Sequence, residues 1–110
     1  MLGFCPIMSE HHYTYILANK YHTTIYVGYT NDLERRLAEH RMGFNPTSFT
    51  SRYHVYKLLW YQEFSDPHYA IAAEKRIKKW SVEKKVALIK EMNPTFEELA
   101  PQENVEKKIP

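Results

Sequence analysis

The stretch YVGYTNDLERRLAEH, residues 26–40, decides the fold, because it joins a short β-strand directly to a capped helix. Asn31 is predicted to be the N-cap of that helix. Glu34 then falls at the third helical position, where its side chain can return the capping hydrogen bond. This start fixes the helical phase, and Leu33 and Leu37 accordingly mark the face that packs on the rest of the domain.

The same phase places two polar side chains on the inward face. At about 100° per residue, Arg36 and His40 lie within roughly 60° of Leu33, whereas Arg35 and Glu39 point to the far side. A cation and an imidazole on the buried face of a helix need partners, because a polar group removed from water loses its hydration. Periodicity therefore selects Arg36 rather than Arg35 as a candidate site residue.

The composition bounds the class of protein. The chain has 110 residues, 44% of them hydrophobic and 15% aromatic, so we expect one domain, over residues 13–99. The net charge of +2 gives no strongly basic field, so nucleic-acid binding has to be argued from a local patch. The single cysteine, Cys5, excludes a disulfide framework and an intrachain cysteine-ligated zinc site, and it fits a cytoplasmic location. Residues 1–12 and 100–110 are predicted to be flexible, and the apolar start is too short for a signal peptide or a membrane span.

Two runs, residues 13–17 and 24–27, are rich in aromatic and β-branched residues. Asn19 and Lys20 lie between them and are typical of a turn, so the two runs predict a β-hairpin.

The register of this hairpin can be predicted from its tyrosines. The expected pairs are Leu17 with Thr24, Tyr15 with Tyr26, and Tyr13 with Gly28. This register puts the hydroxyls of Tyr15 and Tyr26 on the sheet face that looks toward Arg36, and it lays the ring of Tyr13 over Gly28. The alternative is that these are ordinary strand aromatics with solvated hydroxyls.

Residues 43–53 mix turn residues with aromatic and hydroxyl side chains, without a helical or strand period, and predict a long loop. Cations and aromatics in and beside it can hold a phosphate backbone or stack a base. The candidates are Arg41, Phe49, Arg52 and Tyr53. Packing of the loop aromatics on the core is the alternative. A third strand is predicted over residues 55–64, central in the sheet or well covered.

Asp66 and Pro67 predict the start of a second helix, with the aspartate as N-cap and the proline at the first position. Its apolar face is predicted to come from Ala70, Ile71 and Ile77. Glu74 falls in the middle of that face, although an ionised glutamate is rarely buried without a cation, a metal or several donors. An ion pair with Arg36 and a role as metal ligand both account for it.

Ser81 is predicted to cap a third helix, which ends at Asn93-Pro94 and turns Val82, Val86 and Ile89 inward. Basic side chains follow the last two helices: Lys75, Arg76, Lys78, Lys79, Lys84 and Lys85. Such a run is usually a solvated helix face, and it can also track a nucleic-acid duplex. Lys75, Lys78 and Lys79 are the candidate nucleic-acid contacts.

One sheet face and two helices are thus expected to bring together two tyrosines, an arginine, a histidine and a carboxylate, which suits phosphodiester cleavage. The carboxylate and substrate oxygens can share one Mg²⁺, with Mn²⁺ as substitute, while the arginine neutralises charge on the scissile phosphate. A tyrosine has a reference pKa of about 10, so it needs help from His40 or metal-bound water to act as a base near neutrality. The sequence therefore does not decide which residue is the general base.

The order of these residues resembles the GIY-YIG nuclease family, and most of all its small standalone members. The resemblance runs from Tyr13 to Leu99 and rests on residues 26–40, 74–80 and 92–94. By position it implies that Tyr15 and Tyr26 are the motif tyrosines, Arg36 the catalytic arginine, His40 the helix histidine, Glu74 the single metal ligand and Asn93 an asparagine that braces the site. It also implies an α+β fold, with a central three-stranded antiparallel sheet flanked by helices.

The sequence departs from the family pattern at several positions. Tyr13-Thr14 replaces the Gly-Ile of the first motif and Val27 replaces an isoleucine in the second, but both tyrosines are intact. Tyr29 stands where excision-repair members have a lysine. No counterpart is seen of the DNA-reading domain of homing and restriction relatives, or of the zinc module of the resolvase relatives. Substrate choice is therefore expected to come from residues 43–53, the basic helices or another protein.

Three functional hypotheses follow. The first is a metal-dependent endonuclease whose expected substrate is DNA rather than RNA, with Tyr26 or His40 as base, Arg36 as phosphate clamp and Glu74 as Mg²⁺ ligand. The second is a nucleic-acid-binding module or nuclease subunit that needs a protein partner, or a second copy of itself, to act. The third is that the buried charges are structural, with an Arg36–Glu74 ion pair holding helices to sheet.

Overall fold

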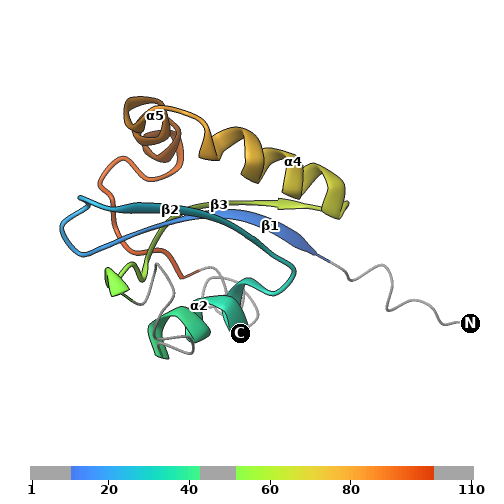
Figure 1. The fold of residues 1–110 in the computed structure, drawn as a ribbon, viewed down its shortest axis with the longest axis horizontal. Coiled ribbons are helices and arrows are strands. Elements are labelled where there is room, and N and C mark those ends of the chain that lie inside the picture. The colour runs from blue at the N-terminus through green and yellow to red at the C-terminus, as the bar shows by residue number, and fades with distance from the viewer. Residues whose placement is uncertain (1–10, 43–51, 101–110) are drawn as a thin grey trace, which may run out of the picture.

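The computed structural model describes residues 11–42 and 52–100. Within these residues the chain forms a three-stranded antiparallel sheet in the order β2-β1-β3, with helices on both faces (Figure 1). The elements are β1 (His12–Ala18), β2 (Ile25–Thr30), α2 (Leu33–Met42), β3 (Lys57–Phe64), α4 (Pro67–Lys78) and α5 (Val82–Met92). The α+β prediction is confirmed. The predictions for residues 1–10, 43–51 and 101–110 lie outside the described residues, and β1 already begins at His12.

The sheet lies between two layers of helix. In Figure 1, α4 and α5 cover one face and α2 lies against the other. The core is divided in the same way. Ile16, Val27 and Ile77 belong to the cluster under α4 and α5, whereas Leu17 and Leu37 belong to the cluster under α2. Successive residues of a strand point to opposite faces, so the central strand contributes its side chains to the two clusters alternately.

The strand order explains why β1 is the most deeply buried element. It pairs with β2 on one side and with β3 on the other, and Tyr15, Ile16, Leu17 and Ala18 are all fully buried. The third strand was expected to be central or well covered. It is an edge strand of the sheet, although its first half is buried.

A β-bulge in β3 lets consecutive residues of that strand pack on the same layer. Ile16 pairs with Trp60 and Leu17 with Leu58, so Leu59 is the extra residue between them. Because a bulge reorients the side chains on one strand, Leu59 and Trp60 both join the cluster under α4 and α5, while Leu58 packs on the α2 side.

The hairpin is confirmed, but its predicted register is wrong by two residues. The observed pairs are Leu17 with Tyr26, Tyr15 with Gly28, and Tyr13 with Thr30. The turn is held by Asn19, whose side chain accepts hydrogen bonds from the backbone N–H groups of Thr23 at 2.8 Å and Thr24 at 2.9 Å. These hydrogen bonds centre the turn one residue later in the chain than predicted, with a loop of the same length, and this moves the register. A shift of two residues keeps each side chain on its predicted face.

The cap of α2 also differs from the prediction. The backbone N–H of Arg35 donates to the side chain of Asp32 at 3.1 Å, and that of Arg36 donates to the Asp32 carbonyl at 3.0 Å. Asp32 is therefore the N-cap, one residue later than Asn31, and Glu34 is not at the position needed for a capping box. Leu33 and the rest of the inward face are nevertheless correct.

The caps of α4 and α5 are as predicted. Asp66 accepts from the His68 N–H at 2.8 Å, and Ser81 accepts from the Lys84 N–H at 3.2 Å. Two predicted inward residues are wrong. Val82, the first residue of α5, is 61% exposed, and Ala73 is buried in α4 where Ile71 is only partly covered.

The segment after α5 returns to the opposite side of the sheet. Asn93 ends α5 and its side-chain amide donates to the carbonyls of Leu59 and Glu97. Phe96 packs against the cluster under α4 and α5, whereas Leu99 packs against the cluster under α2 and donates its N–H to the Leu58 carbonyl at 2.9 Å. In the part of the chain that is described, no helix is long and apolar enough to cross a membrane.

Candidate active site

The candidate site starts from a glycine that lets a tyrosine ring lie across the hairpin. Tyr15, on the central strand, is paired with Gly28. A Cβ added to Gly28 would lie 2.5 Å from both Cζ and Oη of Tyr15, and 2.9 Å from Cε2 of Tyr26. Only glycine leaves room for this arrangement, since real Cβ atoms do not approach other atoms so closely. A ring over the glycine was predicted, but it belongs to Tyr15 and not to Tyr13.

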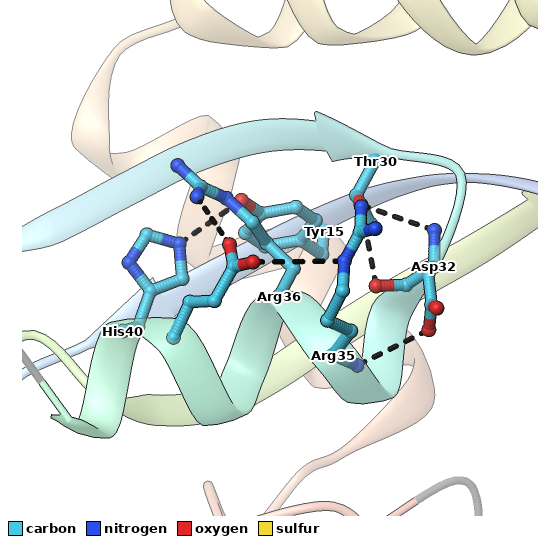
Figure 2. A network of polar contacts seen from close by, with 7 residues as sticks. Tyr15, Thr30, Asp32, Arg35, Arg36 and His40 are labelled. Carbon is cyan, nitrogen blue, oxygen red and sulfur yellow. Dashed lines mark hydrogen bonds and ion pairs between the residues drawn. The ribbon is translucent and has the colours of Figure 1, made fainter. Parts of the chain in front are cut away.

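Helix α2 places a histidine beside the two tyrosines. Leu33 and Leu37 anchor the helix on the sheet, and one turn later the buried His40 lies with its Nε2 atom 3.2 Å from the Tyr15 hydroxyl (Figure 2). The ring centroid of His40 is 6.1 Å from that of Tyr15 and 5.7 Å from that of Tyr26. The three rings form one cluster.

Arg36 lies beside this cluster and has an acidic neighbour. Its side chain extends toward Tyr15 (Figure 2) and is 39% exposed, and its Nη1 atom donates to Glu39 at 2.9 Å. Glu39 also pairs with Arg35, at 3.6 Å. The prediction that Glu39 points away from the site is wrong, because a spacing of three residues lets two long side chains meet along a helix. This spacing is the sequence feature that could have identified Glu39.

Burial keeps both groups of the central hydrogen bond neutral. It raises the pKa of Tyr15 to about 12, with a contribution from Tyr26, while the Arg36 guanidinium opposes the rise. Burial, followed by the nearby charge of Arg36, lowers the pKa of His40 to about 4, against the effect of Glu39. At neutral pH the pair is therefore a phenol and a neutral imidazole, because a buried charged form lacks hydration.

Glu74 approaches the site from α4. Its side chain is 15% exposed and forms an ion pair with Lys78 at 2.6 Å. The Lys78 ammonium lies 6.0 Å from the centroid of the Tyr26 ring, so the pair lies beside that ring. The predicted Arg36–Glu74 ion pair is not formed: among the described residues, Arg36 pairs with Glu39 and Glu74 with Lys78. A purely structural role for that pair is thereby excluded.

Other predicted site residues lie elsewhere. Asn93 is buried under α5 and holds the backbone of β3 and of the segment that follows α5, so its contacts are with the fold and not with the tyrosine cluster. Arg41 is exposed and pairs with Glu98 at 2.5 Å.

The predicted nucleic-acid contacts divide into three groups. Lys78 belongs to the site itself, through Glu74 and Tyr26. Lys75 on α4 and Lys79, the C-cap of that helix, are exposed. Arg52 and Tyr53 are also exposed and contact each other, with 5.7 Å between the guanidinium and the ring centroid. Phe49 lies outside the described residues.

Glu74 is the carboxylate that the sequence predicted as a metal ligand, and the described residues do not surround it with a larger ligand cluster. They contain no group of three or more histidine, cysteine, aspartate or glutamate side chains able to hold one. Glu74 alone fits Mg²⁺, which keeps several of its waters and takes further oxygens from a substrate phosphate. It does not fit a structural Zn²⁺ site, which needs four protein ligands.

The fold and this cluster define a class of protein. Residues 11–87 match the model of the GIY-YIG catalytic domain, which is 70% of the chain, and the chain therefore belongs to the GIY-YIG family. The family implies a nuclease activity on nucleic acid.

The relatives within that family are small UPF0213 proteins. A UPF0213 protein of Bacillus pumilus is 35% identical over 86 residues, which cover 77% of this chain and 86% of the relative. A UPF0213 protein of Haloquadratum walsbyi is 34% identical, and the aligned residues cover 76% of this chain and 92% of the relative. The solution NMR structure of the UPF0213 protein from Bacillus halodurans superposes with a TM-score of 0.52 at 30% identity, covering 80% of this chain and 92% of that one.

Proposed function

We propose that the protein is a metal-dependent endonuclease that hydrolyses phosphodiester bonds in DNA. The observation that carries this proposal is the cluster of Tyr15, Tyr26, Arg36 and His40 with the Glu74 carboxylate beside it. This set combines proton-transfer groups, a phosphate-binding cation and one metal ligand. A metal-dependent hydrolysis of a phosphodiester bond can use all three functions.

Arg36 is the phosphate clamp in this proposal. Its guanidinium is partly exposed, so it can reach a substrate, and Glu39 and Tyr15 hold it at the rim of the cluster. A planar guanidinium can donate two parallel hydrogen bonds to a phosphate and neutralise the charge that develops in the transition state. Substrate phosphate then competes with Glu39 for the same donors.

Tyr26 is the general base in this proposal, in preference to His40; it accepts the proton of the attacking water as a phenolate, after its own phenolic proton has passed to solvent. A pKa of about 4 makes His40 a weak base near neutrality, and its protonation would place an imidazolium next to Arg36. Tyr15 stays protonated, because its pKa is raised to about 12. His40 and Tyr15 are therefore positioning residues that hold Tyr26 and Arg36 in place, and Tyr26 is the less buried tyrosine, beside the Lys78 cation.

Glu74 would hold Mg²⁺, or Mn²⁺ as its substitute. The ion would supply Lewis-acid stabilisation of the phosphate and a bound water of lowered pKa. Lys78 pairs with Oε2 of Glu74, so a metal ion at this carboxylate would compete with the ammonium. The released Lys78 is then free to contact the substrate backbone.

The test is a cleavage assay on branched, single-stranded and duplex DNA with Mg²⁺ or Mn²⁺. Glu74→Gln is expected to lower the rate by about 100-fold or more, since a metal supplies several kcal/mol of transition-state stabilisation. Glu91→Gln is the matched control, because that carboxylate is exposed on α5, and it should leave the rate unchanged. Tyr26→Phe should abolish cleavage, whereas His40→Gln should leave a measurable rate.

Unchanged cleavage by Glu74→Gln would contradict the metal-ligand role. A second function remains: a nucleic-acid-binding subunit that is inactive without a partner. The observation in its favour is that Arg36 and Glu74 are both neutralised within the chain, by Glu39 and Lys78. DNA binding without cleavage by the wild type, with activity restored by a co-purifying protein, would support that alternative.

A further inference from the structure

An open hollow of about 370 Å³ lies at the end of the sheet where β1 stops and β3 starts. We refer to it as the basic hollow. It is formed by the end of β1, the start of β3 and the segment that follows α5, and it is separate from the tyrosine cluster. Its lining residues are Ala18, Lys20, His54, Tyr56, Lys57 and Glu98.

The charges around the basic hollow favour an anion. The Lys57 ammonium is 2.9 Å from Nε2 of His22, and since lysine can only donate, the imidazole accepts and is neutral. The lining carboxylate, Glu98, is neutralised by Arg41 at 2.5 Å. The positive charges of Lys20 and Lys57 are therefore not balanced by the one acid of the lining. This differs from the tyrosine cluster, where each cation has an acidic partner.

Strained backbone gathers around the same hollow. Among the described residues, the non-glycine residues with a left-handed backbone are His22 (φ 60°), His54 (φ 57°) and Phe96 (φ 57°). His54 lines the hollow, His22 orients Lys57, and the Phe96 ring packs on His22 with 5.2 Å between centroids. A strained backbone persists only where the surrounding contacts hold it in place, and strained residues are concentrated at functional sites. Lys57 is thus held by a braced imidazole and is not a freely moving surface lysine.

The surroundings suit a nucleic-acid strand. The rings of His54 and Tyr56 meet edge to face at 6.0 Å, and the Lys20 ammonium lies 5.6 Å from the ring of the exposed Tyr21. Cations interleaved with aromatic rings are the usual platform for a backbone phosphate and its neighbouring base.

The position relative to the cluster suits a strand as well. Ala18 lies three residues beyond Tyr15 on β1, about 10 Å along the strand at 3.3 Å per residue. The two side chains point to opposite faces of the sheet, so the basic hollow lies at the end of the sheet and not on the face of the tyrosine cluster. A nucleic-acid strand spans this distance in a few nucleotides. Arg41 links the two regions, because it follows His40 in α2 and pairs with Glu98 of the hollow.

We infer that the basic hollow binds a backbone phosphate of the nucleic-acid strand, a few nucleotides from the bond cleaved at the tyrosine cluster, with Lys57 and Lys20 as the contacts. This inference rests on the proposed function in one respect: the stated distance between the bound phosphate and the scissile bond assumes that the tyrosine cluster cleaves the strand. The binding itself does not require cleavage, so the two can be tested separately.

The test measures binding of the full chain to a fluorescent 20-nucleotide single strand in EDTA, over 50 to 200 mM salt. Each lost phosphate contact lowers the slope of log K against log salt by about 0.7, which corresponds to about fivefold weaker binding at 100 mM. Lys57→Met and Lys20→Met are each expected to show this loss. Lys90→Met, on the exposed surface of α5, is the matched control and should behave as wild type.

Slopes for Lys57→Met and Lys20→Met that equal the Lys90→Met slope would overturn the inference, and so would a wild type that does not bind the strand. Weaker binding by both variants, in a protein that cleaves nothing with any metal, would support the hollow and contradict the nuclease proposal. Intact cleavage with unchanged salt slopes would support the nuclease proposal and contradict phosphate binding at the basic hollow.

Titration with inorganic phosphate, followed by NMR of the His22 and His54 rings, separates the two sources of a phosphate group. Shifts with the oligonucleotide, at concentrations where free phosphate gives none, support a nucleic-acid contact. Shifts with free phosphate alone would overturn it in favour of a small-anion site.

Discussion

At the scale of single residues, the chemistry of the site depends on a buried hydrogen bond. The Tyr15 hydroxyl and Nε2 of His40 are 3.2 Å apart in a fully buried environment, and this burial keeps the phenol protonated and the imidazole neutral. A solvated strand tyrosine, which was the alternative from composition, would keep an ordinary pKa. Here Gly28 permits the burial, because it leaves space for the Tyr15 ring.

The low pKa of His40 predicts a pH dependence of stability. Its pKa is about 4 in the folded state, against about 6.5 in an unfolded chain, so between these values only the unfolded state takes up the proton. Acidification from pH 6.5 to 4 therefore lowers the free energy of unfolding through this residue, and the loss is complete below about pH 4. Urea unfolding of the wild type and of His40→Gln, at several pH values between 7.5 and 4, measures the difference.

The wild type should lose more stability than His40→Gln across this window. Lys90→Gln is the control, because Lys90 is exposed on α5, and its profile should follow the wild type. Identical profiles for the wild type and His40→Gln would show that His40 does not titrate differently on folding.

At the scale of secondary structure, the phase of α2 decides which side chains reach the cluster. The sequence predicts Asn31 as the N-cap of this helix. The structure uses Asp32, which is itself tied to the end of β2 by a hydrogen bond from its N–H to the Thr30 hydroxyl at 3.1 Å. The inward face is unaffected by the choice of cap, because Leu33 and Leu37 pack on the sheet in either case.

Replacing the two candidate caps tests this assignment. Asp32→Ala is expected to cost about 1 kcal/mol of stability, or about 4–8 °C in Tm for a domain of this size, because the first turn of α2 loses its acceptor. Asn31→Ala should stay within about 0.5 kcal/mol of the wild type, since Asn31 is exposed. Thermal unfolding followed by circular dichroism compares them, and a larger loss for Asn31→Ala would restore the original prediction.

At the scale of the whole molecule, one sheet carries two separate cores. The cluster under α4 and α5 and the cluster under α2 share only the central sheet, and the segment after α5 contacts both, through Phe96 and Leu99. Asn93 starts this crossing by holding the backbones of Leu59 and Glu97. The asparagine that the family resemblance places at the site therefore acts on the fold.

Leu99→Ala tests whether the crossing segment stabilises the domain. Loss of a partly buried leucine is expected to cost about 1–2 kcal/mol, somewhat less than for a fully buried one. Glu97→Ala is the control, because the Glu97 side chain is exposed and its hydrogen bonds to Asn93 are made by backbone groups, and it should change stability by less than about 0.5 kcal/mol. Equal stability of Leu99→Ala and the wild type in urea unfolding would show that the segment is not part of the folded unit.

Much of the fold could be predicted because its evidence is local. The hairpin, the start of α4 at Asp66-Pro67 and the start of α5 at Ser81 each follow from residues adjacent in sequence. The hairpin register could not be predicted, because it depends on how the Asn19 side chain bonds across the turn. The edge position of β3 depends on pairing between segments about 45 residues apart, which no local pattern encodes.

For the candidate site, the sequence alone determined the inward face of residues 33–40, with Arg36 and His40 on it, since helical periodicity is a property of the backbone. It also determined that Glu74 lies near the inward face of its own helix. Only the tertiary structure decided the partners: Tyr15 for His40, Glu39 for Arg36 and Lys78 for Glu74. The physical reason is that burial and ion pairing depend on which surfaces meet across the sheet, and those contacts are set by packing and not by the spacing of residues along the chain.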